Sequence, residues 1–179
     1  MALTFAATTS RAEDQRLPEP SVLVRTVTKA AEYDRHLAAR ANGHVRTMIV
    51  FRSGDAASEK TAHDLARFFG STEKIAGWAH EESVDRYSGA NALAAEIRSQ
   101  QVSIVVLSTG LGDEAPAIAH ELDGIDVLSV AVDPDDVPKG IVFGVDARAG
   151  SPTLVIRLAQ ARRQNVAFEA SLLKLARIE

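Results

Sequence analysis

Two glycine-containing turns hold the residues whose types and spacing could do chemistry. Gly110 and Gly112 follow an apolar run, and Asp113 opens the next predicted helix, where nucleotide-binding folds hold a phosphate on free N–H groups. Ala115 stands where the full fingerprint has a third glycine, and Asp113 and Glu114 place negative charge where a phosphate would lie. The sequence therefore favours a simple glycine turn with Asp113 as a helix cap.

The second turn contains Gly54, Asp55 and Ser58, again after an apolar run. Asp55 is placed to cap the following helix, and the missing Gly-Lys-Ser/Thr ending excludes a P-loop. Open α/β sheets bind small molecules at the carboxyl ends of their strands, where both turns are expected. Gly54, Asp55, Ser58, Gly110 and Gly112 are therefore the candidate ligand-binding residues.

The sequence contains no recognised catalytic or metal-binding motif. The five histidines lack metal-ligand spacing, and His80-Glu81-Glu82 predicts a surface loop. No Gly-x-Ser-x-Gly occurs, and the carboxylate pairs Glu81-Glu82 and Asp135-Asp136 lie in polar stretches typical of solvated charge. We therefore expect no enzyme, no metal and no cofactor.

The composition is that of one globular domain. The chain has 179 residues, 46% of them hydrophobic and 25% charged, and this length is enough to bury its own core. Its 24 acidic and 20 basic residues give a formal net charge of −4, which argues against nucleic-acid binding through a general positive field. The absence of cysteine excludes disulfides and thiolate metal sites. No stretch is long and apolar enough to predict direct membrane insertion.

Helices and strands alternate along the chain at the spacing of an α/β sheet. Helices are predicted at 22–41, 56–69, 89–101, 113–122 and over most of 158–178, and strands at 45–51, 74–79, 102–107, 126–132, 140–146 and 152–157. The predicted fold class is α/β, a single-domain three-layer sandwich with a mostly parallel sheet and helices on both faces. The last two strands are expected to form an antiparallel edge pair across a turn at 148–151. Residues 1–20 are interpreted as a disordered leader or signal-peptide remnant, and 21–179 as the domain.

Two further segments have distinctive patterns. In the first helix Tyr33 falls on the apolar face, and Asp34 and Arg35 are expected at its rim. After the last strand, a short basic helix with Arg162 and Arg163 is followed by Asn165, which permits a left-handed turn. A final helix is expected to bury Leu172, Leu173, Leu175 and Ala176.

The C-terminal segment resembles the ending of the YfiR-like (YfiR/HmsC-type) family, in which a strand leads into Asn-Leu-x-x-Ala-Arg-x-x-Gly and then a terminal Ser-x-Leu-Leu-x-Leu-Ala-Arg. The matching residues are Leu158, Ala161, Arg162, Ser171, Leu172, Leu173, Leu175, Ala176 and Arg177. Those from Ser171 onward, together with Tyr33, Asp34 and Arg35, are interpreted as mainly structural. Tyr33-Asp34-Arg35 and the turn at 54–58 resemble the matching parts of one branch. Arg157 stands where the family usually has Asn and Asn165 where it has Gly. The bridging cysteines of some members are missing, and with them the basis for redox control.

The resemblance implies a periplasmic, dimeric, non-enzymatic regulator that binds the outer part of a membrane-bound diguanylate cyclase and lowers cyclic di-GMP signalling and biofilm formation. Arg157, Arg162 and Arg163 are the candidate contacts for such a partner. Two alternatives stay open: a small-ligand sensor resembling one lobe of a periplasmic binding protein, with the ligand over the glycine turns, and a structural subunit of an envelope assembly.

Overall fold

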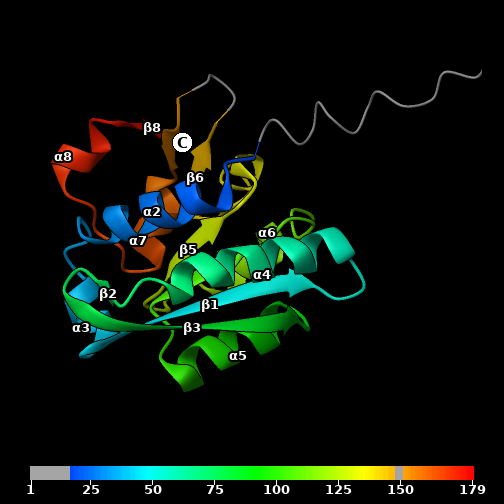
Figure 1. The fold of residues 1–179 in the computed structure, drawn as a ribbon. Coiled ribbons are helices and arrows are strands. Elements are labelled where there is room, and N and C mark those ends of the chain that lie inside the picture. Colours follow the sequence, from blue (N-terminus) through cyan, green and yellow to red (C-terminus); the bar gives the residue numbers. More distant parts are fainter. Residues whose placement is uncertain (1–16, 148–150) are drawn as a thin grey trace, which may run out of the picture.

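Among the described residues, 17–147 and 151–179, a mixed sheet of eight strands forms the centre of this computed structural model (Figure 1). The strand order is β2-β3-β1-β4-β5-β6-β7-β8. Most of the expected leader and of the turn at 148–151 lies outside the described residues. The strands are β1 (His44–Arg52), β2 (Lys74–Ile75), β3 (Trp78–Tyr87), β4 (Ile104–Leu107), β5 (Leu128–Ala131), β6 (Phe143–Asp146), β7 (Thr153–Ile156) and β8 (Ala176–Ile178). The helices are α2 (Pro20–Ala31), α3 (Leu37–Ala41), α4 (Ala56–Gly70), α5 (Ala90–Gln100), α6 (Ala115–Glu121), the 3-10 helix η1 (Pro134–Asp136), α7 (Leu158–Arg163) and α8 (Ala170–Leu173).

Two hydrophobic cores lie on the two faces of the sheet. On one face α2 and α4 bury side chains such as Leu23 and Leu65, and on the other α5 and α6 bury Leu93 and Ile118. Strand β4 contributes alternate residues to both cores, as its unbroken apolar run predicts. The predicted three-layer α/β fold is confirmed.

The predicted helix at 22–41 is in fact two helices, α2 and α3, separated by five residues. Asp34 leaves the helical path to form an isolated antiparallel β-bridge with Phe168. The expected end of the helical region is confirmed, because Asn42 caps α3 in a left-handed conformation with φ 45°.

Strand β3 is much longer than the sequence predicts. The stretch 74–79 forms β2 and the start of β3, joined by Ala76 and Gly77, both with positive φ. The expected surface loop at His80-Glu81-Glu82 is wrong, because these residues continue β3 in parallel pairing with the whole of β1. Beyond β3 the sheet has only the two-residue β2, so the strand is largely half-exposed and carries a polar sequence.

The C-terminal segment also differs from the expected long helix. Strands β6 and β7 form the predicted antiparallel pair, but the chain then makes only the short helices α7 and α8 before ending in β8. Strand β8 pairs in parallel with β7 and becomes the last strand of the sheet. Asn165 adopts the predicted left-handed conformation, with φ 51°.

Candidate functional site

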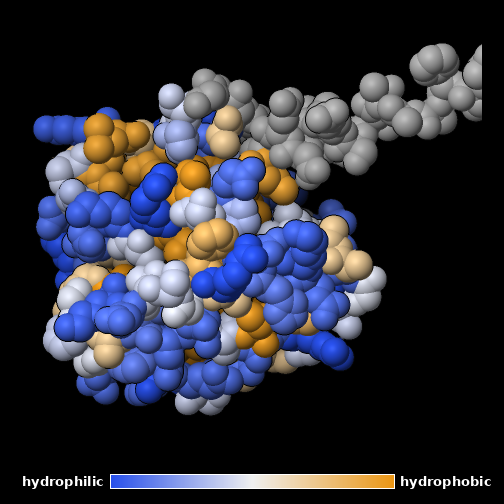
Figure 2. All heavy atoms as spheres, viewed as in Figure 1, coloured by the Kyte–Doolittle hydropathy of each residue, from blue (hydrophilic) through white to orange (hydrophobic). Residues whose placement is uncertain are grey.

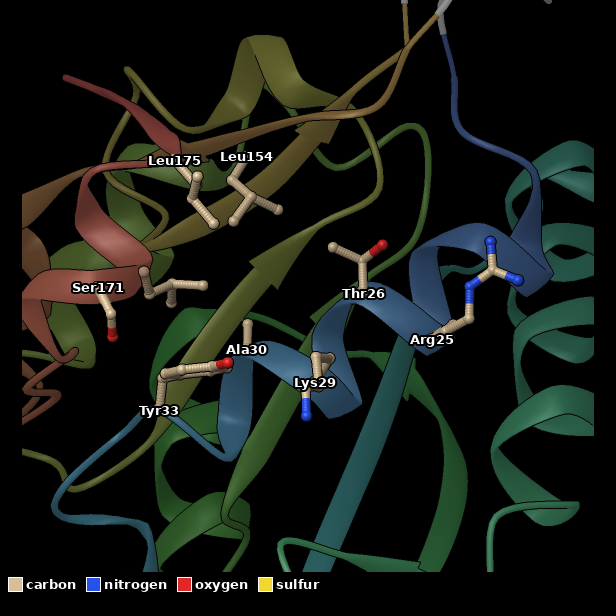
Figure 3. A pocket seen from close by; sticks show the side chains of 9 residues that line it. Arg25, Thr26, Lys29, Ala30, Tyr33, Leu154, Ser171 and Leu175 are labelled. Carbon is tan, nitrogen blue, oxygen red and sulfur yellow. The ribbon is translucent and has the colours of Figure 1, made fainter.

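An apolar groove of about 540 Å³ lies between α2 and the C-terminal segment (Figure 3). We call it the α2–α8 groove. Its lining residues come from α2 and the turn after it, from β7, from α8 and from the turn between α8 and β8: Arg25, Thr26, Lys29, Ala30, Tyr33, Leu154, Ser171, Leu172 and Leu175. Segments more than a hundred residues apart in the sequence thus form one surface.

The two walls of the groove differ in character. Figure 3 shows Leu154 and Leu175 close together on the C-terminal side, and on the other side Lys29 on α2 and Tyr33 on the turn after it. Leu172 is buried, and Leu154 and Tyr33 are half-buried against the core beneath. The floor is therefore continuous with the hydrophobic core on this face of the sheet.

The C-terminal wall exposes large apolar side chains. Leu175 is 74% exposed, which contradicts the predicted burial of this residue, and Ile178 is 44% exposed. Ile178 pairs with Ile156, and directly paired residues point to the same face of a sheet, so Ile178 lies on the face that α2 covers farther along. Apolar atoms gather over α8 and β8 in the surface view of Figure 2.

The α2 wall carries the positive charge of the groove. Among the described residues, the exposed Arg25 side chain has no hydrogen-bond or ion-pair partner. Lys29 forms an ion pair with Glu32 at 2.5 Å and lies 5.7 Å from the centre of the Tyr33 ring. The hydrogen bond with Glu32 raises the pKa of the Lys29 amine, so this side chain stays protonated. The rim of an otherwise apolar groove is therefore basic.

The buried carboxylate of Asp34 fixes the two walls to one another. Asp34, expected at the rim, is instead buried and paired with the guanidinium of the buried Arg40. The other carboxylate oxygen, Oδ1, accepts the N–H of His36 at 3.1 Å and the N–H of Ala167 at 3.0 Å. Asp34 thus holds the chain after α2 against the segment that leads into α8.

The structure brings the two predicted glycine turns together at the carboxyl ends of β1 and β4. Asp55 accepts the N–H groups of Ala57 and Ser58, each at 3.0 Å, which confirms its role as the cap of α4. Gly110, with φ +80°, approaches so closely that a Cβ there would lie 2.6 Å from Asp55 Oδ2. Arg52 donates a hydrogen bond from its guanidinium to the Gly110 carbonyl.

The polar groups around these turns largely bond to one another. The Ser58 hydroxyl accepts the Arg52 N–H at 2.9 Å, and the Ser108 hydroxyl donates to the Ser58 carbonyl at 2.7 Å. Tyr87 donates its hydroxyl to Glu114 at 3.1 Å, and burial together with this bond raises the pKa of Tyr87 to about 12. Gly54 lies at the start of α4 with open space around it. Ligand binding by this cluster stays a prediction.

Gly112 lies against an ion pair between a buried carboxylate and an exposed lysine instead. A Cβ at this glycine would lie 2.5 Å from Asp136 Oδ1, which pairs with Lys139 at 2.8 Å. Asp136 is buried, and this burial raises the pKa of its carboxyl, so the predicted solvation of this carboxylate is wrong. The predicted cap of α6 is also wrong, because Glu114 and not Asp113 precedes the helix and makes no side-chain cap.

The candidate partner contacts lie in and beside another hollow. Arg157 and Arg163 line a pocket of about 190 Å³ together with His120 and Lys139, whereas Arg162 is exposed outside it. Arg157 donates to the Pro138 carbonyl at 2.7 Å, and Arg163 pairs with Asp123 at 3.5 Å. The role of these three arginines as partner contacts stays a prediction.

The C-terminal motif supplies one wall of the α2–α8 groove. Ser171, Leu172 and Leu175 line it, Leu173 and Ala176 pack half-buried against the core, and Arg177 pairs with Asp146 at 3.0 Å. The residues that sequence reasoning missed as part of a site are Arg25, Thr26, Lys29, Ala30 and Leu154. The only sequence signal for them is the spacing of Arg25 and Lys29, which puts both cations on one side of a helix.

The residues that the structure describes contain no group of three or more metal-ligating side chains that could hold an ion. Among the same residues, no helix has both the length and the apolar character needed to cross a bilayer.

Solved structures with the same fold are periplasmic-binding-like α/β proteins. The ABC domain from Streptococcus pneumoniae in complex with L-Trp has a TM-score of 0.61 at 11% identity, over 89% of this chain and 61% of its own. A conserved domain protein from Vibrio cholerae has a TM-score of 0.59 at 10% identity, over 90% and 60%. The open, ligand-free substrate-binding protein CD0873 from Clostridium difficile has a TM-score of 0.57 at 9% identity, over 86% and 59%. The chain thus spans about three fifths of each, and at these identities the likeness shows the fold alone.

Sequence comparison identifies the family. The YfiR/HmsC-like family matches residues 71–177, which is more than half of the chain and includes α8 and Leu175 of the groove. The chain belongs to the YfiR/HmsC-like family, whose members are periplasmic regulators. A comparison with curated proteins found no match.

Proposed function

We propose that this protein is a non-enzymatic periplasmic regulator that binds the periplasmic domain of a membrane-bound diguanylate cyclase and lowers cyclic di-GMP signalling and biofilm formation. Membership of the YfiR/HmsC-like family supports a regulatory role. The observation that carries the proposal is the α2–α8 groove, because the family's own C-terminal motif builds its exposed apolar wall.

The chemistry of the groove suits a protein contact. Its surface is mostly apolar, with a basic rim, and exposed apolar surface is a common mark of a binding surface. An inhibitor needs a surface complementary to its target and no reactive groups. The groove therefore supports regulation by binding.

The proposed function is tested by deleting the gene in its native host and measuring cyclic di-GMP. We expect the concentration to rise several-fold, and biofilm to increase, with both restored by the exported wild-type chain. A chain retained in the cytoplasm is the matched control and should restore neither. Unchanged cyclic di-GMP after deletion would contradict a cyclase inhibitor.

The periplasmic site and the homodimer belong to the same proposal. Cell fractionation should recover the chain with periplasmic markers, and light scattering of the purified chain should give twice the mass of 19.1 kDa. Recovery with cytoplasmic markers would overturn the location, and a monomeric mass at micromolar concentration would overturn the dimer.

The size of the groove favours one second function, that of a small-ligand sensor. Pockets for small molecules typically have volumes of about 300–1,000 Å³, which includes that of the groove. A thermal-shift screen with small carboxylates and nucleotides tests this function. A saturable rise of several degrees supports it, and no rise at millimolar concentrations argues against it.

A further inference from the structure

The sheet face beside the α2–α8 groove lacks part of its helical layer. Parallel strands are normally covered on both faces. Strands β7 and β8 pair in parallel, yet Ile178 is 44% exposed on the α2 face, and Leu175 just before β8 is 74% exposed. Figure 3 shows the uncovered space between α2 and the C-terminal segment, with Leu154 and Leu175 at one side.

We propose that an amphipathic helix of the partner occupies the α2–α8 groove, places its apolar side chains on Leu154, Leu172 and Leu175, and directs an acidic side chain to Arg25. The inference rests on the proposed function, because it supplies the contact through which the regulator binds a membrane protein. Helix-in-groove binding uses apolar residues at i, i+3 or i+4, and i+7. Such a helix completes the layer that α2 begins.

Charge decides between a foreign helix and a second copy of this chain. Arg25 is exposed and its side chain has no partner among the residues described, and Lys29, which is paired with Glu32, lies on the same rim. Two copies joined groove to groove would bring these cations toward one another, and like charges at an interface are unfavourable. An acidic side chain on the occupant would instead supply the counter-charge that Arg25 lacks.

Photo-cross-linking in the native host identifies the occupant. A photoreactive p-benzoylphenylalanine placed at Thr26 lies in the groove, and one placed at Ser99 on α5 is the control on the opposite face of the sheet. We expect the Thr26 probe alone to capture a membrane-protein segment with helical apolar spacing and an Asp or Glu at one end. Capture of a second copy, of residues 1–16 of this chain, of lipid, or of nothing would overturn the inference.

Binding of the captured segment, made as a synthetic peptide, measures the contacts. Leu175→Asp should weaken the affinity for the peptide more than about 30-fold, because it places a charge at the centre of the apolar contact. Since Leu175 is exposed, the substitution should not unfold the chain. Trp78→Asp, at the opposite end of the sheet, is the matched control and should leave affinity unchanged. Equal affinity for the Leu175→Asp and wild-type chains would refute the apolar contact.

A charge reversal tests the polar contact. Arg25→Glu should weaken binding about tenfold, mostly through a slower association that depends on salt. A peptide with its acidic residue changed to Lys should bind the Arg25→Glu chain better than it binds wild type. Arg98→Glu on α5 is the control. If the Lys peptide binds the Arg25→Glu chain no better than it binds wild type, the proposed contact between Arg25 and an acidic side chain is refuted.

The cyclic di-GMP assay separates the two proposals. If deletion raises the cyclic di-GMP concentration and the Leu175→Asp chain returns it fully to the wild-type level, the groove inference fails and the regulatory function stands. If deletion has no effect, the regulatory function fails, and peptide binding still decides whether the groove takes a helix.

Discussion

Removing the carboxylate of Asp34 should be among the most damaging single substitutions in the protein. Its side chain accepts three hydrogen bonds, from Arg40 and from the N–H groups of His36 and Ala167, and both charged side chains are almost completely buried. Asp34→Ala leaves the Arg40 guanidinium buried without a counter-charge, which costs about 3–5 kcal/mol. This is a large part of the roughly 5–15 kcal/mol by which domains are stable.

Urea unfolding followed by circular dichroism measures this loss. With a urea dependence of about 2 kcal/mol per molar, a loss of about 4 kcal/mol lowers the midpoint by about 2 M. Glu32→Ala is the matched control. It breaks only the exposed ion pair with Lys29 and should lower the free energy of unfolding by less than about 1 kcal/mol.

A double variant tests the reason for the loss. Asp34→Asn keeps the Oδ1 acceptor for the two backbone N–H groups, and adding Arg40→Met removes the buried charge. The double variant should be more stable than Asp34→Ala, since replacing both members of a buried pair is often tolerated. If Asp34→Ala lowers the free energy of unfolding by less than about 1 kcal/mol, the Asp34 carboxylate does not hold the two walls together and the reasoning is refuted.

Three further predictions follow from the described contacts. Burial lowers the pKa of His80 below 6.5, so the unfolded chain binds the proton more tightly; the free energy of unfolding should fall as pH drops through and below 6.5, and His80→Gln should flatten that fall. Gly140 has φ +126°, and Gly140→Ala would put a Cβ 2.5 Å from a side chain of α6. The free energy of unfolding in urea should fall by about 2–4 kcal/mol, against about 1 kcal/mol for Gly43→Ala, where a Cβ meets open space. Arg162→Glu and Arg163→Glu should leave the melting temperature within about 2 °C of wild type, and unchanged cyclase binding in both would exclude them as contacts.

Local chemistry made several features predictable. Asp55 capping α4 depends on a side chain and two N–H groups within three residues. The left-handed Asn42 and Asn165 reflect the tolerance of asparagine for positive φ. Strand β4 could be predicted because an unbroken apolar run has few other places in a soluble fold.

Longer-range pairing made other features unpredictable. The polar sequence of β3 is typical of a loop, but the backbone hydrogen bonds to β1, more than thirty residues away, make it a strand. Ala176 and Leu175 have helical spacing with the leucines before them, yet pairing with β7 draws the chain into β8 and leaves Leu175 exposed. Short-range periodicity carries no information about such partners.

The sequence by itself determined the α/β class, the alternation of elements and the family, because these depend on residue types and spacings along one stretch of chain. Only the tertiary structure decided that α2 and the C-terminal motif share a groove. The bonds that close it join Asp34 to Ala167 and Phe168, so the site exists only once the two ends of the domain have packed together.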